Sequence, residues 1–242
     1  MRTDGRKPDE LRLLTFKRRY TRIAAGSTLV RMGRTTVLCT CSVEEGVPPF
    51  LVGTGKGWLT AEYSMLPGST RPRKQRDRAG KVDGRSVEIQ RLIGRSLRSV
   101  IHLDKLGERT LAIDCDVLEA DGGTRTASIN GAYVALADAL AASAAVLPAG
   151  EPILYDSVAA ISAGIVDGVA MLDLCYEEDR DAEVDLNLVM TGSGKLVEVQ
   201  GTGEEATFTR KQLDHMLDLG RQGIEAITAK QKRALAKNWP LD

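Results

Sequence analysis

A glycine turn followed by a hydroxyl and a cation is the part of the sequence best suited to hold a phosphate. Residues 122–125 read Gly-Gly-Thr-Arg and precede apolar residues that recur at helical spacing from Ile129 to Leu147, so a long helix ending before Pro148 is predicted. A helix beginning here would present free backbone N–H groups beside the side chains of Thr124 and Arg125. We therefore expect Gly123, Thr124 and Arg125 to bind an oxyanion. A glycine turn with a threonine cap and a surface arginine is the alternative that these residues leave open.

A second cation stands at the start of another predicted helix. Asp83 is a suitable N-cap for a helix reaching about residue 103, whose apolar face would carry Ile89, Ile93, Leu97 and Val100. Arg85 falls in the first turn, where unpaired backbone N–H groups also point. If the two helix starts converge, Arg85 would join Thr124 and Arg125 around one anion.

An acidic segment supplies candidate ligands for a cation. Residues 177–185 contain six acids and one arginine. We expect Asp179 to end one strand and Asp185 to begin the next, so that a short connection brings both carboxylates to a single hard cation. An acidic turn exposed to water is the alternative, and it best describes the other acids taken singly: Glu177, Asp181 and Glu183.

Three further aspartates could compete with this pair. Asp114 and Asp116 share one face of a strand predicted at residues 111–117, and Asp121 lies close to the glycine turn. We interpret all three as structural hydrogen-bond acceptors rather than catalytic groups.

A basic segment precedes the first of these helices. Residues 71–81 carry six cations and one anion, and Pro72 and Gly80 interrupt any periodicity, so an exposed loop is predicted. The loop is either simply solvated or an electrostatic clamp on a sugar-phosphate backbone. Aromatic residues form 4% of the chain and none lies in this loop, which argues against base stacking there.

The sequence argues against a P-loop and against histidine-dependent catalysis. The GTGKG run at residues 53–57 is not a P-loop, because Phe50 and Gly57 occupy the positions of the required glycine and hydroxyl residue. The chain has two histidines, His102 and His215, and neither lies in a recognisable catalytic motif. Histidine-dependent catalysis is therefore not expected.

The composition is that of an ordinary globular protein. The 242 residues are 43% hydrophobic and 27% charged, enough for one large domain or two halves. Lysine plus arginine equals aspartate plus glutamate at 33 each, so no overall field favours a polyanionic partner. No signal peptide or membrane span is recognisable, and the predicted location is cytoplasmic. The four cysteines lack zinc-site spacing and are expected in the core of a reduced protein: Cys39, Cys41, Cys115 and Cys175.

Two predicted hairpins suggest how the remaining elements are arranged. They pair residues 27–32 with 35–43 and residues 158–165 with 169–176. Each is later followed by a long helix, the last of which begins with the capping-box pair Thr209 and Gln212. This hints at duplicated βα halves, about residues 1–147 and 150–242.

Motifs along almost the whole chain resemble the ribonuclease PH family. They are RTDGR at 2–6, VLCT at 37–40, EEGVP at 44–48, GW-TAEY-MLP at 57–67, GR--EIQRLIGRSLR at 84–98, DCDVLEADGGTRTASI at 114–129 and EVQGT at 198–202. The resemblance implies an α+β fold of the ribosomal protein S5 domain 2 type, with residues 1–242 as one catalytic domain in a hexameric ring, a trimer of dimers. It also implies phosphorolysis, in which inorganic phosphate removes nucleotides from the 3′ ends of precursor transfer RNAs as nucleoside 5′-diphosphates, reversibly.

The resemblance also assigns roles to the candidate residues. It implies that phosphate binds to Arg85, Gly123, Thr124 and Arg125, and that Mg²⁺ binds to Asp179 and Asp185. Which of the two aspartates acts as general acid stays open. Arg73 and Arg76 would contact transfer RNA. Relatives often have arginine where this chain has Gly68, so the roles of Arg71 and Arg78 also stay open.

Catalysis on this view depends on positioning and charge rather than on histidine. A rival hypothesis is a silent ring subunit that only binds RNA. Retention of the five implied phosphate and metal residues argues against it: Arg85, Thr124, Arg125, Asp179 and Asp185.

Overall fold

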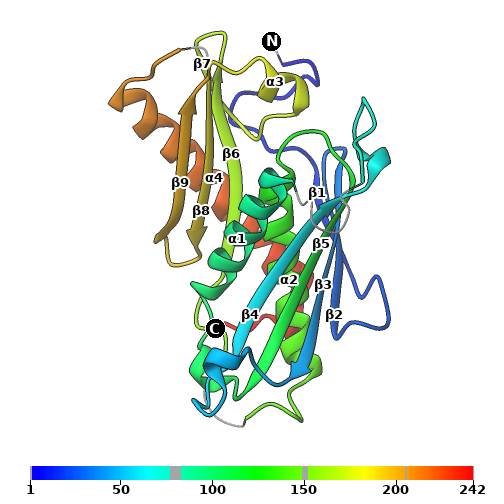
Figure 1. Ribbon diagram of the computed structural model, residues 1–242. Helices are drawn as coiled ribbons and strands as arrows, with labels where there is room; N and C mark the ends of the chain where they lie inside the picture. Colours follow the sequence, from blue (N-terminus) through cyan, green and yellow to red (C-terminus); the bar gives the residue numbers. More distant parts are fainter. Residues whose placement is uncertain (1, 77–82, 149–151, 205, 242) are drawn as a thin grey trace.

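Two β-sheets and three long helices form the fold of the computed structural model, which describes residues 2–76, 83–148, 152–204 and 206–241 (Figure 1). The first sheet contains β1 (Leu14–Arg18), β2 (Gly26–Met32), β3 (Thr35–Glu45), β4 (Trp58–Met65) and β5 (Arg109–Glu119). Its strand order is β1-β2-β3-β5-β4. Only β4 and β5 pair in parallel, because α1 (Gly84–Arg98) connects them as a crossover.

The second sheet is antiparallel throughout, in the order β7-β6-β8-β9. Its strands are β6 (Val158–Val166), β7 (Val169–Leu172), β8 (Val184–Thr191) and β9 (Leu196–Gly203). The long helix α4 (Arg210–Leu235) packs against this sheet. Short 3-10 turns complete the fold at Pro49–Leu51, Pro67–Ser69, Leu103–Lys105 and Ala236–Asn238. The predicted α+β class is confirmed, whereas the division into duplicated halves stays a prediction.

Both predicted hairpins are confirmed. Gly33, at φ +59°, turns β2 into β3, and β6 turns into β7 through Asp167 and Gly168 at φ +50° and +71°. Two successive positive φ values are typical of the tight turns that match strand twist. β7 ends at Leu172, earlier than predicted.

The helix α2 (Thr124–Ala142) lies between the two sheets (Figure 1). It packs against β2 and β3 on one side and β6 on the other, so it is buried all round rather than amphipathic. The Asn130 side chain, in the middle of this helix, donates to the carbonyl of Ala160 at 2.9 Å and accepts from its N–H at 2.8 Å. This exchange fixes α2 against β6.

The predicted helix ends are corrected in two places. α1 ends at Arg98 rather than near residue 103, and α2 ends at Ala142 although apolar residues continue to Leu147. Val100, beyond the end of α1, is fully buried, whereas Ala144 and Val146, beyond the end of α2, are exposed. Apolar spacing thus marked burial correctly after α1 but overestimated both helix length and burial after α2.

One candidate site residue lies on a different element from the one predicted. Asp179 lies on a short helix, α3 (Tyr176–Arg180), and not at the end of a strand. Asp173, at φ +57°, terminates the strand pattern, and Glu178 accepts the N–H of Cys175 at 3.0 Å to cap the helix.

The predictions for the cysteines and for the last helix are confirmed. The four cysteines are free and buried, and the sulfurs of Cys39 and Cys115 lie 3.8 Å apart below α2. Thr209 and Gln212 form the capping box that begins α4. Among the described residues, no helix has the length and hydropathy needed to cross a membrane.

Candidate active site

The Gly-Gly-Thr-Arg turn forms the start of α2, as predicted. Gly122 and Gly123 have φ values of +75° and +65°, which glycine adopts without strain. No side chain of the described residues caps this helix start, so its first N–H groups are free for an anion. The Tyr63 hydroxyl donates to Thr124 Oγ1 at 2.9 Å, which leaves the threonine proton to donate elsewhere.

Arg125 connects three elements of the site. Its Nη1 donates to Gln200 Oε1 on β9 at 2.7 Å and to Glu88 Oε1 on α1 at 3.2 Å. The guanidinium of Arg125 is therefore held between the first helix and the second sheet.

Arg85 lies in the first turn of α1, where it was predicted. Asp83 caps the helix by accepting the Arg85 N–H at 3.3 Å, while the Arg85 side chain is exposed. Burial raises the pKa of Tyr63, and the charges of Arg85 and Arg125 oppose that rise. The starts of α1 and α2 lie close together, because Arg125 Nη1 on α2 is 3.2 Å from Glu88 Oε1 on α1.

The two candidate acids lie beside these cations. Burial raises the pKa of Asp179, and the charges of Arg85 and Arg125 oppose that rise. Burial, followed by the charge of Asp179, raises the pKa of Asp185 to about 6. Asn187 donates to Asp185 Oδ2 at 3.0 Å, but Oδ1 of Asp185 is buried and has no hydrogen-bond partner among the described residues.

These acids fit a hard divalent cation. A buried carboxylate oxygen without a partner, next to a second carboxylate that raises its pKa, is stabilised when a cation binds. Mg²⁺ is commonly held by one or two carboxylates, with water and phosphate oxygens completing the shell. Within the described part of the chain no cluster of three or more His, Cys, Asp or Glu could hold a metal ion.

The basic loop starts next to the phosphate site. Lys74 Nζ lies 3.0 Å from Asp83 Oδ2, which joins the loop to the start of α1, and Arg73 and Arg76 are exposed. Residues 77–82, including Arg78, lie outside the described residues.

Two of the three alternative aspartates accept hydrogen bonds within the fold. Asp114 accepts from the Thr40 hydroxyl at 3.1 Å, and Asp121 accepts from the N–H of Tyr176 at 3.4 Å. Burial raises the pKa of Asp116, as do the neighbouring charges of Asp114 and Glu62. None of the three is among the acids that shift the pKa of Asp179 or Asp185.

Comparison with known proteins agrees with this geometry. Residues 10–142 match the 3′ exoribonuclease family, domain 1, and residues 156–223 match domain 2 of the same family. A ribonuclease PH of Corynebacterium glutamicum (strain R) is 58% identical over 97% of this chain and 96% of its own. The chain belongs to the ribonuclease PH family.

A second ribonuclease PH and two solved structures are also similar to the chain. One from Rhodopirellula baltica is 54% identical over 96% of this chain and 97% of its own. The Archaeoglobus fulgidus exosome with RNA bound to the active site superimposes with a TM-score of 0.79 at 24% identity, covering 95% of this chain and 92% of that chain. Rice Rrp46 gives 0.78 at 20% identity, covering 97% and 100%, so these two support the fold alone.

Membership of the ribonuclease PH family defines the reaction. The chain is a phosphate-dependent 3′-to-5′ exoribonuclease that acts in transfer RNA processing, with RNA as substrate and inorganic phosphate as co-substrate.

Sequence reasoning missed several residues of this ribonuclease PH site. Tyr63 and Gln200 lie inside the motifs that carry the family resemblance, so the signal was present but had no role attached. Arg12 carries no such signal, because its partners are more than a hundred residues away in the chain.

Proposed function

We propose that this enzyme removes 3′-terminal nucleotides from precursor transfer RNAs at a site built from Arg85, Gly123, Thr124, Arg125 and the pair of acids. The observation that supports this most directly is the position of Arg125, whose Nη1 lies 3.2 Å from Glu88 Oε1 on α1 and 2.7 Å from Gln200 Oε1 on β9, the strand paired with the one that carries Asp185. Anion-binding and cation-binding groups then face the same reacting phosphates.

The phosphate would be held at the start of α2. Arg85 and Arg125 supply charge, the Thr124 hydroxyl and the N–H groups after Gly123 donate hydrogen bonds, and Gln200 fixes the guanidinium of Arg125. A bound phosphate oxygen attacks the phosphorus of the last phosphodiester. That bond forms as the bond to the 3′ oxygen of the preceding nucleotide breaks, and a nucleoside 5′-diphosphate leaves.

Positioning carries most of the catalysis. Phosphate is already a nucleophile once oriented, so holding it in line supplies much of the rate enhancement. The leaving 3′ oxygen takes up a proton. Burial raises the pKa of Asp185 to about 6, so its carboxyl can donate that proton when no cation holds it as the carboxylate.

Asp179 and Asp185 would also hold Mg²⁺. When bound, the ion would neutralise charge on the scissile phosphate. The partnerless oxygen of Asp185 supports this assignment.

The substrate strand would approach along the basic loop. Arg73 and Arg76 are exposed on the segment that Lys74 joins to the start of α1, so their charges lie on the path to Arg85. Contacts of this kind bind the backbone of any sequence.

We further propose a homohexamer, a trimer of dimers, in the cytoplasm. The fold's likeness to an archaeal exosome core, with a TM-score of 0.76, supports a ring, and the free cysteines suit a reducing compartment.

A 3′-extended RNA tests the reaction. We expect nucleoside diphosphates only when phosphate and Mg²⁺ are both supplied, and nucleoside monophosphates, or equal turnover without phosphate, would reject phosphorolysis. Arg85→Ala should raise the KM for phosphate. Arg221→Ala is the matched control, because Arg221 is exposed on α4 and pairs only with Glu225.

A further inference from the structure

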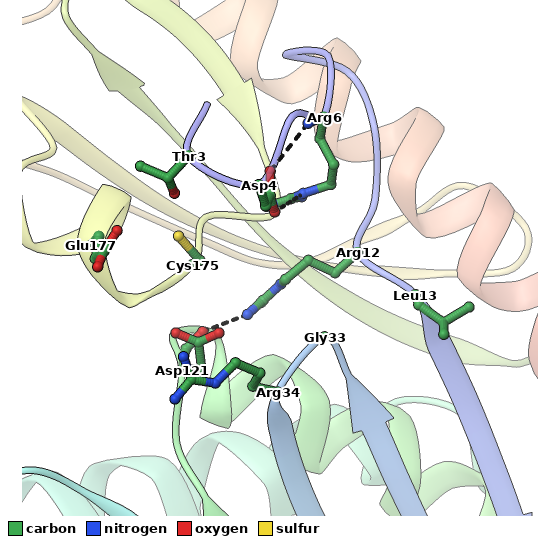
Figure 2. A pocket seen from close by; sticks show the side chains of 10 residues that line it. All are labelled: Thr3, Asp4, Arg6, Arg12, Leu13, Gly33, Arg34, Asp121, Cys175 and Glu177. Carbon is green, nitrogen blue, oxygen red and sulfur yellow. Dashed lines mark hydrogen bonds and ion pairs between the residues drawn. The ribbon is translucent and has the colours of Figure 1, made fainter. Parts of the chain in front are cut away.

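A buried arginine from the N-terminal segment contacts the turn that begins α2. Arg12 is 5% exposed and extends from the segment before β1 toward Asp121, in a pocket of 340 Å³ (Figure 2). Its Nε and Nη2 donate to Asp173 Oδ1 at 3.1 and 2.6 Å. Its backbone N–H donates to Asp173 Oδ2 at 2.7 Å, which completes a tight pair.

The same guanidinium also holds the phosphate-binding turn. Nη1 of Arg12 donates to the carbonyl of Asp121 at 2.5 Å, and Nη2 lies 3.4 Å from the carbonyl of Gly122. Asp121 and Gly122 directly precede the start of α2, whereas Asp173 precedes α3, which carries Asp179. One side chain therefore joins the segment that binds phosphate to the segment that carries the acid.

The backbone at Gly122 packs directly against the segment at residues 174–176, so there is no room for a side chain between them. A Cβ atom at Gly122 would lie 2.7 Å from the carbonyl oxygen of Leu174 and 2.9 Å from the nitrogen of Tyr176. The charge of Arg12 is also among those that oppose the raised pKa of Asp179.

A second N-terminal arginine fixes the same helix. Arg2, 6% exposed, donates from Nε and Nη2 to the two carboxylate oxygens of Glu178, each at 2.8 Å. It also donates to the carbonyls of Leu172 and Asp173 at 2.8 and 2.9 Å. Glu178 is the neighbour of Asp179, so Arg2 holds the helix that bears Asp179.

We propose that Arg12, assisted by Arg2, is a positioning residue that sets the distance between the phosphate-binding turn and the acidic helix. The inference rests on the proposed roles of Thr124, Arg125 and Asp179. Only the planar fork of arginine can reach both a carboxylate and two carbonyls at once, whereas a lysine keeps the charge but not the bridge.

A matched pair of variants tests the proposal. Half-buried Arg18 forms a second Arg–Asp pair with buried Asp138, and it also donates to the carbonyl of Ala234 at 2.7 Å, but it joins β1 to α2 and α4 outside the site. Arg12→Lys and Arg18→Lys therefore make the same chemical change. Both should lower the thermal midpoint.

The kinetics then separate positioning from stability. At a temperature where both variants are folded, Arg12→Lys should lower kcat for phosphorolysis about 10- to 100-fold, as loss of a supporting contact does at other sites. The KM for RNA should not change, and Arg18→Lys should keep wild-type kcat. Equal kinetics in the two variants, or a changed KM for RNA alone, would overturn the proposal.

Two further measurements keep the test decisive. If Arg12→Lys does not fold, Arg2→Lys replaces it with the same expected fall in kcat and the same overturning result. Wild-type enzyme is assayed first with and without phosphate. A wild type that needs no phosphate refutes the proposed function, whereas a phosphate-dependent wild type with an unaffected Arg12→Lys refutes only the positioning role.

Discussion

Tyr63 orients the Thr124 hydroxyl, which we propose donates a hydrogen bond to the bound phosphate. Tyr63→Phe keeps the ring and removes the hydrogen bond. We expect the KM for phosphate to rise roughly 2- to 10-fold, equivalent to about 0.5–1.5 kcal/mol for one neutral hydrogen bond. Steady-state kinetics at varied phosphate concentration measure this.

A second tyrosine provides the control for that variant. The buried hydroxyl of Tyr133 has no hydrogen-bond partner among the described residues. Tyr133→Phe should therefore leave the KM for phosphate unchanged. The same rise in both variants would mean that Tyr63 has no specific role.

Asp185 carries the sharpest prediction at this scale. Asp185→Asn keeps the shape of the side chain but removes its charge and its acidic proton, so turnover should be abolished while RNA binding is largely retained. Filter binding and product release measure the two separately. Asp181→Asn, an exposed acid of the same cluster that pairs with Arg180, should behave as wild type. Loss of RNA binding in Asp185→Asn would show that its role is wrongly assigned.

At the scale of elements, the turn before α2 is limited by backbone packing as well as by φ. Gly122 and Gly168 both have positive φ, but only Gly122 has backbone atoms within 4 Å of an added Cβ. Gly168→Ala should lower the free energy of unfolding by about 1–2 kcal/mol. Gly122→Ala should lower it by roughly 1–3 kcal/mol more. Denaturant titration compares them, and equal losses would show that the loop contact is soft.

The basic loop should act through charge alone. Removing Arg73 and Arg76 together should raise the KM for transfer RNA substrates and flatten the dependence of binding on salt, because fewer counterions are released. Titrations at several salt concentrations give the slope. Removing Arg210 and Arg221 from α4 takes away the same charge elsewhere and should leave the slope unchanged. An unaltered slope in the loop variant would exclude the loop from the RNA path.

At the scale of the whole molecule, both sheets contribute to one site. Thr124 and Arg85 come from the helices of the first sheet, whereas Asp185 and Gln200 come from strands of the second. α2, buried between the sheets, joins these two groups (Figure 1).

The assembly is a prediction at this scale. Light scattering on the purified enzyme should give a mass six times the 26.1 kDa of the chain. Full transfer RNA trimming by a monomer would contradict the proposed ring.

The sequence was sufficient wherever the physical cause is local. The helix starts at Asp83 and at residues 122–125 and the two tight turns follow from glycine, capping and periodicity within a few residues. The chemical type of the phosphate and metal ligands follows equally directly. The roles of these residues as phosphate and metal ligands stay predictions.

Only the tertiary structure decided which of these groups meet. Arg85 and Arg125 lie together because α1 and α2 pack against each other. Asp179 lies on α3 because Asp173 ends the preceding strand. Arg12 pairs with Asp173, which is 161 residues away in the chain. Contacts between residues so distant in the chain leave no periodic signal, since they form only when the sheets close on α2. The sequence by itself thus determined the chemistry available, and the packing of the two sheets determined where it is assembled.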